Sequence, residues 1–97
     1  MRERGIARDL WPQLQRIAVD YGFTKVTRVE MTIGSFHGAL GELLEHGLED
    51  IFPGSPFEGA VVSVHVVAPG DSFRVPTRDE PQTASGWEIF VTDMVGE

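Results

Sequence analysis

The chain has 97 residues, of which 41% are hydrophobic and 24% are charged, and it carries a net charge of −7 with no cysteine. This length allows one small domain with a thin core, which an oligomeric or partner interface would help to stabilise. The absence of cysteine excludes a disulfide framework, a thiolate zinc site and a cysteine nucleophile, and the acidic balance argues against nucleic-acid binding.

No segment contains the roughly 18 to 20 consecutive apolar residues that a membrane span requires. The first residues, Met-Arg-Glu-Arg, also lack the apolar run of a signal peptide. We therefore expect a soluble cytoplasmic protein without a membrane partner. The charge is unevenly distributed: residues 1–30 have a net charge of +2 and the remaining residues a net charge of −9. This difference is explained by ordinary surface charge that keeps the protein soluble, or by electrostatic attraction of a binding partner.

A first amphipathic helix is predicted from apolar residues spaced three and four apart. This stripe comprises Ile6, Leu10, Leu14, Ile17, Ala18 and Tyr21. Gly22 should end the helix in a left-handed conformation, with Phe23 packing back on the last turn. The sequence allows two N-terminal boundaries for this helix. Asp9 would be a good N-cap, whereas a helix that begins before Ile6 would contain Pro12, which would kink it.

Three further elements follow before a long connection. Residues 25–34 alternate with period two and predict a half-buried strand with Thr27, Val29, Met31 and Ile33 on one side. Apolar residues in 39–52 again have the helical spacing, which predicts a second helix that ends before Pro53. Residues 60–68 form a Val-rich strand, with Val62, Val64 and Val66 on one side and Ser63 and His65 on the other.

Residues 69–86 are rich in Pro, Gly, Asp, Ser and Thr and predict a long exposed loop, in which residues 73–75 could briefly extend as a strand. Residues 87–95 then form the last strand. The order α-β-α-β-loop-β predicts an α+β fold in which two helices pack on one face of a mixed three-stranded sheet, and the strand-helix-strand unit makes the first two strands parallel.

The three histidines, His37, His46 and His65, form no Ser-His-Asp arrangement with their neighbours, and no phosphate-loop motif is present. We therefore predict that the chain is not an enzyme. His46 shares a predicted helix face with Glu42, Glu49 and Asp50, which indicates either ligands for a divalent metal or a solvated acidic face.

The other two histidines and one tryptophan have open roles. His37 follows the first strand, where it could cap the next helix, line a site or be exposed. His65 could pair with Glu30 or Glu88 across the sheet. Trp11 lies off the apolar stripe of the first helix, so it either makes an exposed contact or covers the core.

Taken together, these segments resemble the HypA family of accessory proteins for nickel insertion into hydrogenase and urease. The resemblance rests on a Met-x-Glu start, a first helix ending at Tyr21-Gly22, the Val-Thr-Arg-Val-Glu-Met-Thr-Ile-Gly strand at 26–34, a second helix, and Phe-Glu-Gly-Ala at 57–60 leading into a Val-rich strand. It covers residues 1–68 and 86–97, so residues 1–97 read as a single HypA-like domain.

The resemblance implies a nickel site at the N-terminus, for which this chain offers the Met1 amine and the backbone amides of Arg2 and Glu3. We add the hypothesis that Glu3 and His37 lie near this site. The family places a histidine at position 2, where this chain has Arg2, whose protonated guanidinium cannot donate to a metal. We therefore expect at most weak nickel binding.

The resemblance also implies a zinc part before the last strand, held by two CxxC pairs. Here residues 69–86 contain neither Cys nor His, so no zinc is expected and the segment should be a short mobile loop in place of the insertion. The implied partners are proteins of nickel-enzyme maturation. The alternative is a divergent adaptor or regulatory module that has lost both metal sites.

Overall fold

The structure is a computed structural model that describes residues 2–75 and 78–97, with side chains from residue 5 onward within these ranges. Helix α1 (Arg2–Asp20) is followed by strand β1 (Val26–Gly34), a short 3-10 helix η1 (Ser35–His37) and helix α2 (Leu40–Ile51). Strands β2 (Val61–Val67), β3 (Ser72–Phe73), β4 (Gln82–Thr83) and β5 (Ile89–Gly96) complete the fold.

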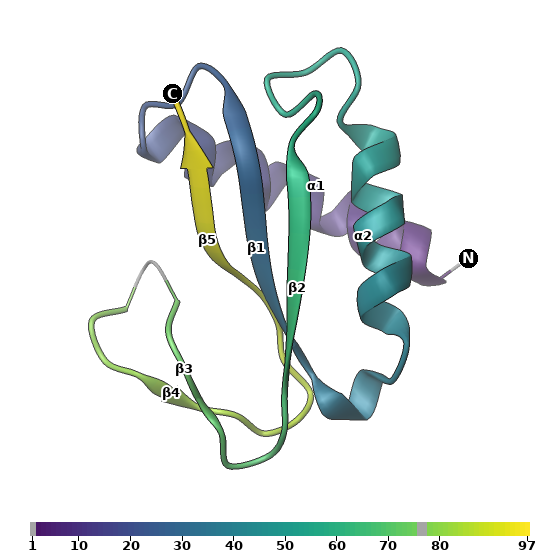
Figure 1. Ribbon diagram of the computed structural model, residues 1–97, viewed down its shortest axis with the longest axis vertical. Helices are drawn as coiled ribbons and strands as arrows, with labels where there is room; N and C mark the ends of the chain where they lie inside the picture. Colours follow the sequence, from purple (N-terminus) through teal and green to yellow (C-terminus); the bar gives the residue numbers. More distant parts are fainter. Residues whose placement is uncertain (1, 76–77) are drawn as a thin grey trace.

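The main sheet has the order β2-β1-β5, in which β1 is parallel to β2 and antiparallel to β5 (Figure 1). This arrangement confirms the predicted α+β class, with two helices and a mixed three-stranded sheet. The chain can place β1 and β2 in parallel because α2 makes the crossover between them. The C-terminal strand then adds to the free edge of β1.

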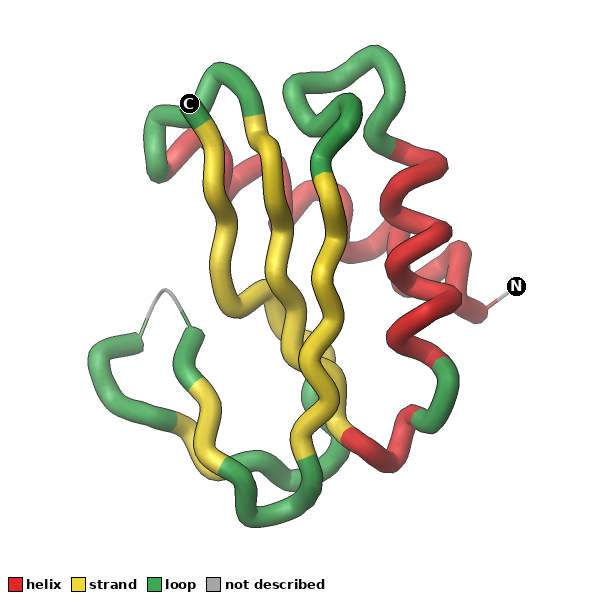
Figure 2. Tube along the Cα trace, in the orientation of Figure 1, coloured by secondary structure: helices red, strands yellow, loops and turns green. Residues whose placement is uncertain are grey.

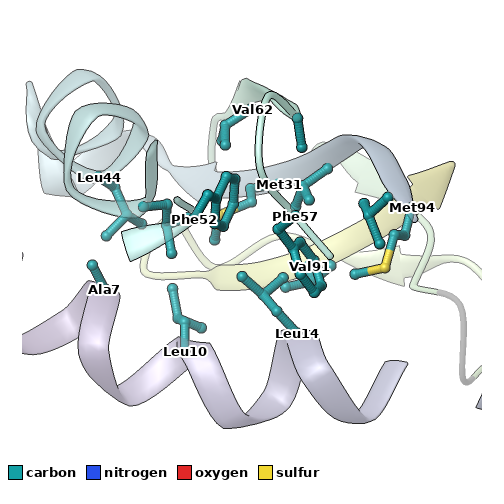
Figure 3. Packing of buried hydrophobic residues seen from close by; sticks show 14 of the residues in the cluster. Ala7, Leu10, Leu14, Met31, Leu44, Phe52, Phe57, Val62, Val91 and Met94 are labelled. Atoms are coloured by element: carbon teal, nitrogen blue, oxygen red, sulfur yellow. The ribbon is translucent and has the colours of Figure 1, made fainter. Parts of the chain in front are cut away.

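The hydrophobic core lies between the helices and the sheet, where both helices and all three main strands contribute to one cluster (Figure 3). Helix α1 supplies Ala7, Leu10, Leu14 and Ala18, and α2 supplies Leu44 and Leu48. The sheet supplies Val29, Met31, Ile33, Val62, Val91 and Met94. The helical and strand periods read from the sequence therefore meet in a single core.

The two ends of α1 resolve the open points of the sequence. The helix begins at Arg2, before Ile6, and Pro12 therefore lies inside it. At the other end, the N–H of Phe23 donates to the carbonyl of Ala18 and that of Gly22 to the carbonyl of Val19. Gly22 has φ of +74°, which makes this a Schellman cap and confirms the predicted stop.

Two predictions about strand faces are wrong in detail. Val26 is fully buried and Thr27 is exposed, because the pairing of β1 with β5 shifts register between Val26 and Arg28. A bulge of this kind breaks the strict alternation of side chains. In β2, Val62 is buried but Val66 is 61% exposed. The N-terminal turn of α2 covers Val64, where a Cβ on Gly41 would lie 2.9 Å from the Cγ1 atom, and Val66 extends beyond that contact.

Residues 69–75 and 78–86 are more regular than the predicted loop. Strands β3 and β4 pair antiparallel, with Ser72 opposite Thr83 and Phe73 opposite Gln82. This hairpin lies on the β5 side of the main sheet, away from α2 (Figures 1 and 2). The rings of Phe73 and Phe90 stack with centroids 5.8 Å apart, which ties the hairpin to β5.

Candidate functional site

The predicted nickel donors at the N-terminus are only partly within the described chain. Met1 lies outside the described residues. Arg2 and Glu3 form the start of α1, and their side chains lie outside the described part of the structure. The first four N–H groups of an α-helix have no acceptor within the helix. The backbone nitrogens of Arg2 and Glu3 therefore belong to the class of amides that helix formation leaves unpaired.

His37 is fixed by a residue 50 positions further along the chain. Its Nε2 atom lies 2.9 Å from the carbonyl oxygen of Trp87, and the two rings meet edge to face with centroids 5.5 Å apart. Because a carbonyl oxygen only accepts, Nε2 must carry the proton of this hydrogen bond. In the neutral imidazole the lone pair is then on Nδ1, which is the usual state of a histidine that is prepared to bind a metal.

A hollow of about 480 Å³ brings the first helix and His37 together. Its walls come from Ile6 of α1, from Phe36 and His37 of η1, and from Leu40 and Trp87. Ile6 is four residues after Arg2, which corresponds to about 6 Å along a helix axis. The fold thus places His37 near the first turns of α1, the part of the chain in which the sequence analysis placed the backbone donors.

The turn that carries Trp87 is held by the carboxylate of Glu88. One carboxylate oxygen accepts the Ser85 N–H at 2.6 Å and the Ser85 hydroxyl at 2.9 Å, and the other accepts the Gly86 N–H at 2.9 Å. Glu88 is only 8% exposed. Burial by itself raises the pKa of Glu88, but the hydrogen bonds from Ser85, from its own backbone and from Gly86 outweigh burial and lower the pKa below its ordinary value of 4.5.

The same turn is joined to the end of β1 by backbone contacts. The Gly34 N–H donates to the Glu88 carbonyl and the Phe36 N–H to the Gly86 carbonyl. A Cβ on Gly34 would collide with the Gly86 backbone, and a Cβ on Gly86 would lie 2.5 Å from the Phe36 ring. Gly86 also has φ of +97°, so glycine is required at both positions to bring these segments together.

The acidic face of α2 gathers no metal site. His46, Glu42, Glu49 and Asp50 are exposed. Among the side chains that the structure describes, in residues 5–75 and 78–97, no group of three or more His, Asp or Glu is placed to hold a metal ion. The exposure of these side chains is that of a solvated acidic surface.

His65 and Trp11 each take one of the roles left open by the sequence. His65 pairs with Glu30, with its Nε2 atom 2.9 Å from a carboxylate oxygen, and not with Glu88. This hydrogen bond is the largest cause of the lowered pKa of Glu30, against which desolvation acts, with Arg28 adding an electrostatic contribution. Trp11 covers the core, with its ring 5.1 Å from Phe57 and 5.8 Å from Phe52.

A second and larger groove of about 710 Å³ runs between α1, β5 and the β3–β4 hairpin. Its walls combine apolar side chains such as Phe73 and Phe90 with charges of both signs, including Asp9 and Arg16. Among the residues whose side chains the structure describes, none of the nickel donors predicted from the sequence lines this groove, whereas His37 lines the smaller hollow, and we therefore place the candidate site at His37.

The roles of Trp87 and Glu88 at this site were not predicted from the sequence. Trp87 was expected only as the first residue of the last strand, and Glu88 only as a possible partner of His65. The available signal was the Ser-Gly pair at 85–86 directly before the last strand, because Ser and Gly are typical of tight turns.

No helix in the described part of the chain is long and apolar enough to cross a membrane.

One of two comparisons with known proteins supports, in part, the resemblance read from the sequence. No family model matches the chain. A curated protein, the hydrogenase maturation factor HypA of Azorhizobium caulinodans, is 36% identical over 64 residues, which is 66% of this chain and 57% of that protein. The matched part thus spans little more than half of the relative, and the similarity supports a HypA-like relationship.

Proposed function

We propose that this chain is a HypA-like accessory protein for the maturation of a nickel enzyme, in particular a hydrogenase. In this role it is not an enzyme: it binds Ni(II) weakly as cargo and docks onto other maturation proteins in the cytoplasm. The similarity to a hydrogenase maturation factor supports the proposed role in hydrogenase maturation. The observation that carries the nickel-binding part is the position of His37, held by Trp87 beside the first turns of α1.

The donor set proposed for nickel consists mainly of nitrogen. It comprises the Met1 amine, the backbone amides of Arg2 and Glu3, and Nδ1 of His37, with the Glu3 carboxylate as a further candidate. Imidazole and other nitrogen donors suit Ni(II), and a set of this kind is compatible with a near-planar arrangement. Arg2 contributes only its backbone because its guanidinium stays protonated.

The weakness of the site follows from the same residues. A histidine at position 2 would add an imidazole directly next to the amine, whereas His37 must reach the N-terminus from η1. Zinc is not part of the proposal because the chain has no cysteine, and residues 69–86 contain neither His nor Cys.

A second candidate function is a divergent adaptor that kept the scaffold and lost both metal sites. Arg2 favours this alternative, because it stands where the family resemblance implies a histidine ligand. In that case the protein surface around Trp87, and not the N-terminus, would be the functional part. The two candidates differ in whether any nickel binds.

Calorimetric titration of Ni(II) into the untagged chain with a free Met1 amine tests the proposal. We expect weak binding that is lost on N-terminal acetylation and reduced in His37→Ala, while the matched exposed-histidine variant His46→Ala binds as the parent chain does. Arg2→His should strengthen binding at least tenfold, equivalent to about 1.4 kcal/mol. No binding in the parent chain and no gain in Arg2→His would reject nickel binding and favour the adaptor.

A further inference from the structure

Three successive carbonyl groups in residues 86–88 receive hydrogen bonds from the segment at the end of β1 and the start of η1. The first of them accepts the Phe36 N–H at 2.9 Å, and the last accepts the Gly34 N–H at 2.8 Å. Between them, the Trp87 carbonyl accepts Nε2 of His37 at 2.9 Å. The imidazole is thus the side-chain member of a row of hydrogen bonds, and its orientation depends on where residues 86–88 lie.

Glu88 holds the middle of this row from inside the turn. Its carboxylate accepts the N–H groups of Ser85 and Gly86 and the Ser85 hydroxyl, and that hydroxyl in turn accepts the Trp87 N–H at 3.2 Å. Glu88 is buried, so these bonds are shielded from water. Hydrogen bonds to an ionised acceptor are stronger than those between neutral groups. The carboxylate therefore anchors the peptide group that leads into Trp87.

This anchor bears on the nitrogen that His37 presents to a metal. Because Nε2 is engaged with the Trp87 carbonyl, Nδ1 carries the lone pair of the neutral ring. An outer hydrogen bond of this kind orients a metal-binding imidazole, and its loss typically lowers metal affinity about 10- to 100-fold. The partner here is a backbone carbonyl, which no substitution of Trp87 removes. The side chains that hold this carbonyl are therefore the ones through which the orientation of the ring can be changed.

We propose that Glu88 is a positioning residue for the nickel donor His37. Through Ser85 and the peptide groups of Trp87, its carboxylate holds the carbonyl that orients the imidazole, and it does so without contacting the metal. This inference rests on the proposed function, in which Nδ1 of His37 is one of the nickel donors. It adds a buried carboxylate directly before β5 to a site whose other groups come from the N-terminus and from η1.

Calorimetric titrations of Ni(II) into three variants test this role. Glu88→Gln should weaken nickel binding about tenfold, at the lower end of the effect of losing an outer hydrogen-bond partner. Ser85→Ala should weaken binding in the same direction but less. Because Ser85→Ala keeps the Glu88 carboxylate, its effect cannot come from a lost negative charge. Ser85→Thr, which keeps the hydroxyl, should bind nickel as the parent chain does.

The effect of Glu88 must pass through the imidazole. In a His37→Ala chain, the addition of Glu88→Gln should therefore cause no further loss of nickel affinity. Gly22→Ala is the control for general destabilisation, because it strains a position with φ of +74° where a Cβ meets nothing within 4 Å. Gly22 follows the C-terminal end of α1, on the opposite side of the molecule from the N-terminus (Figure 1). Its nickel affinity should equal that of the parent chain.

A measurement without nickel follows the ring itself. In NMR of the parent chain we expect NOEs between the rings of His37 and Trp87, whose centroids lie 5.5 Å apart. These NOEs should weaken in Glu88→Gln and Ser85→Ala and persist in Gly22→Ala. If the parent chain binds no nickel while the NOEs follow this pattern, the proposed nickel function is rejected and the anchoring of His37 by Glu88 is supported on its own.

Two results would overturn the inference. The first is parent-like nickel affinity and parent-like NOEs in a folded Glu88→Gln chain. The second is an equal loss of nickel affinity when Glu88→Gln is added to His37→Ala, which would show that Glu88 acts on the metal without the imidazole. Where Glu88→Gln does not fold, Ser85→Ala decides, and unchanged affinity and NOEs in that variant reject the positioning role.

Discussion

The carbonyl oxygen of Trp87 accepts a hydrogen bond from Nε2 of His37 across a separation of 50 residues and a distance of 2.9 Å. This contact joins the 3-10 helix after β1 to the turn before β5. It determines which imidazole nitrogen carries the proton in neutral His37, and it holds the exposed indole of Trp87 beside that imidazole. The proposed nickel donor His37 and the turn that carries Trp87 therefore form one structural unit.

The first prediction concerns the tautomer of His37. When the imidazole is neutral, we expect the proton on Nε2 and the lone pair on Nδ1, because the Trp87 carbonyl can only accept. Long-range 1H–15N NMR of the histidine side chains distinguishes the two tautomers directly. The exposed His46 serves as an internal reference, and a dominant Nδ1–H form at His37 would contradict the geometry.

The second prediction concerns the buried carboxylate of Glu88. Replacement by Gln should lower the free energy of unfolding by about 1 to 3 kcal/mol, because the new amide NH₂ group cannot accept the hydrogen bonds that a carboxylate oxygen receives from Ser85 or Gly86. Urea denaturation measures the change. The exposed control Glu49→Gln should change stability by less than about 0.5 kcal/mol.

Glu88 also gives stability a defined dependence on pH. Its pKa in the folded chain lies below the ordinary value of 4.5, so the folded state binds the proton less readily than the unfolded state does. The stabilisation is fully present above pH 4.5 and is lost as the pH falls through the lower folded pKa. Denaturation curves between pH 3 and 6 should therefore show a smaller loss of stability in Glu88→Gln than in the parent chain; parallel curves would argue against this assignment.

The third prediction separates backbone strain from close packing at two glycines. Gly70 and Gly86 have similar φ of +92° and +97°, but a Cβ at Gly70 meets nothing within 4 Å, whereas one at Gly86 meets the Phe36 ring. Gly70→Ala should destabilise the chain by about 1 to 2 kcal/mol from φ alone. Gly86→Ala should cost at least about 1 kcal/mol more because of overpacking. Thermal unfolding of both variants checks the order, and equal losses would mean that Phe36 moves freely aside.

The fourth prediction concerns the Glu30–His65 pair on the outer face of the sheet. Removing the imidazole in His65→Ala should raise the pKa of Glu30 toward 4.5, since the hydrogen bond from His65 is the largest cause of its depression. A pH titration of the Glu30 carboxyl carbon by NMR measures the shift. His46→Ala should leave that titration unchanged, and a similar shift in both variants would show that long-range charge and not the hydrogen bond controls Glu30.

The sequence by itself determined the order of the elements and much of the core. Helical spacing in residues 6–18 and the alternation of Val29, Met31 and Ile33 predict which side chains face inward, because burial within one element repeats with that element's own period. The Schellman cap at Gly22 is equally local. Composition also determined the donor types, since a chain without cysteine offers no thiolate, and Arg2 offers no imidazole at the second position.

Only the tertiary structure decided which distant residues meet. The contact of His37 with Trp87 depends on how the ends of β1 and β5 come together, and the exposure of Thr27 depends on a bulge where β5 pairs with β1. Trp11 faces the core because Phe52 and Phe57 lie against α1. Periodicity describes each element separately, whereas these contacts arise from strand register and close packing between elements far apart in the chain.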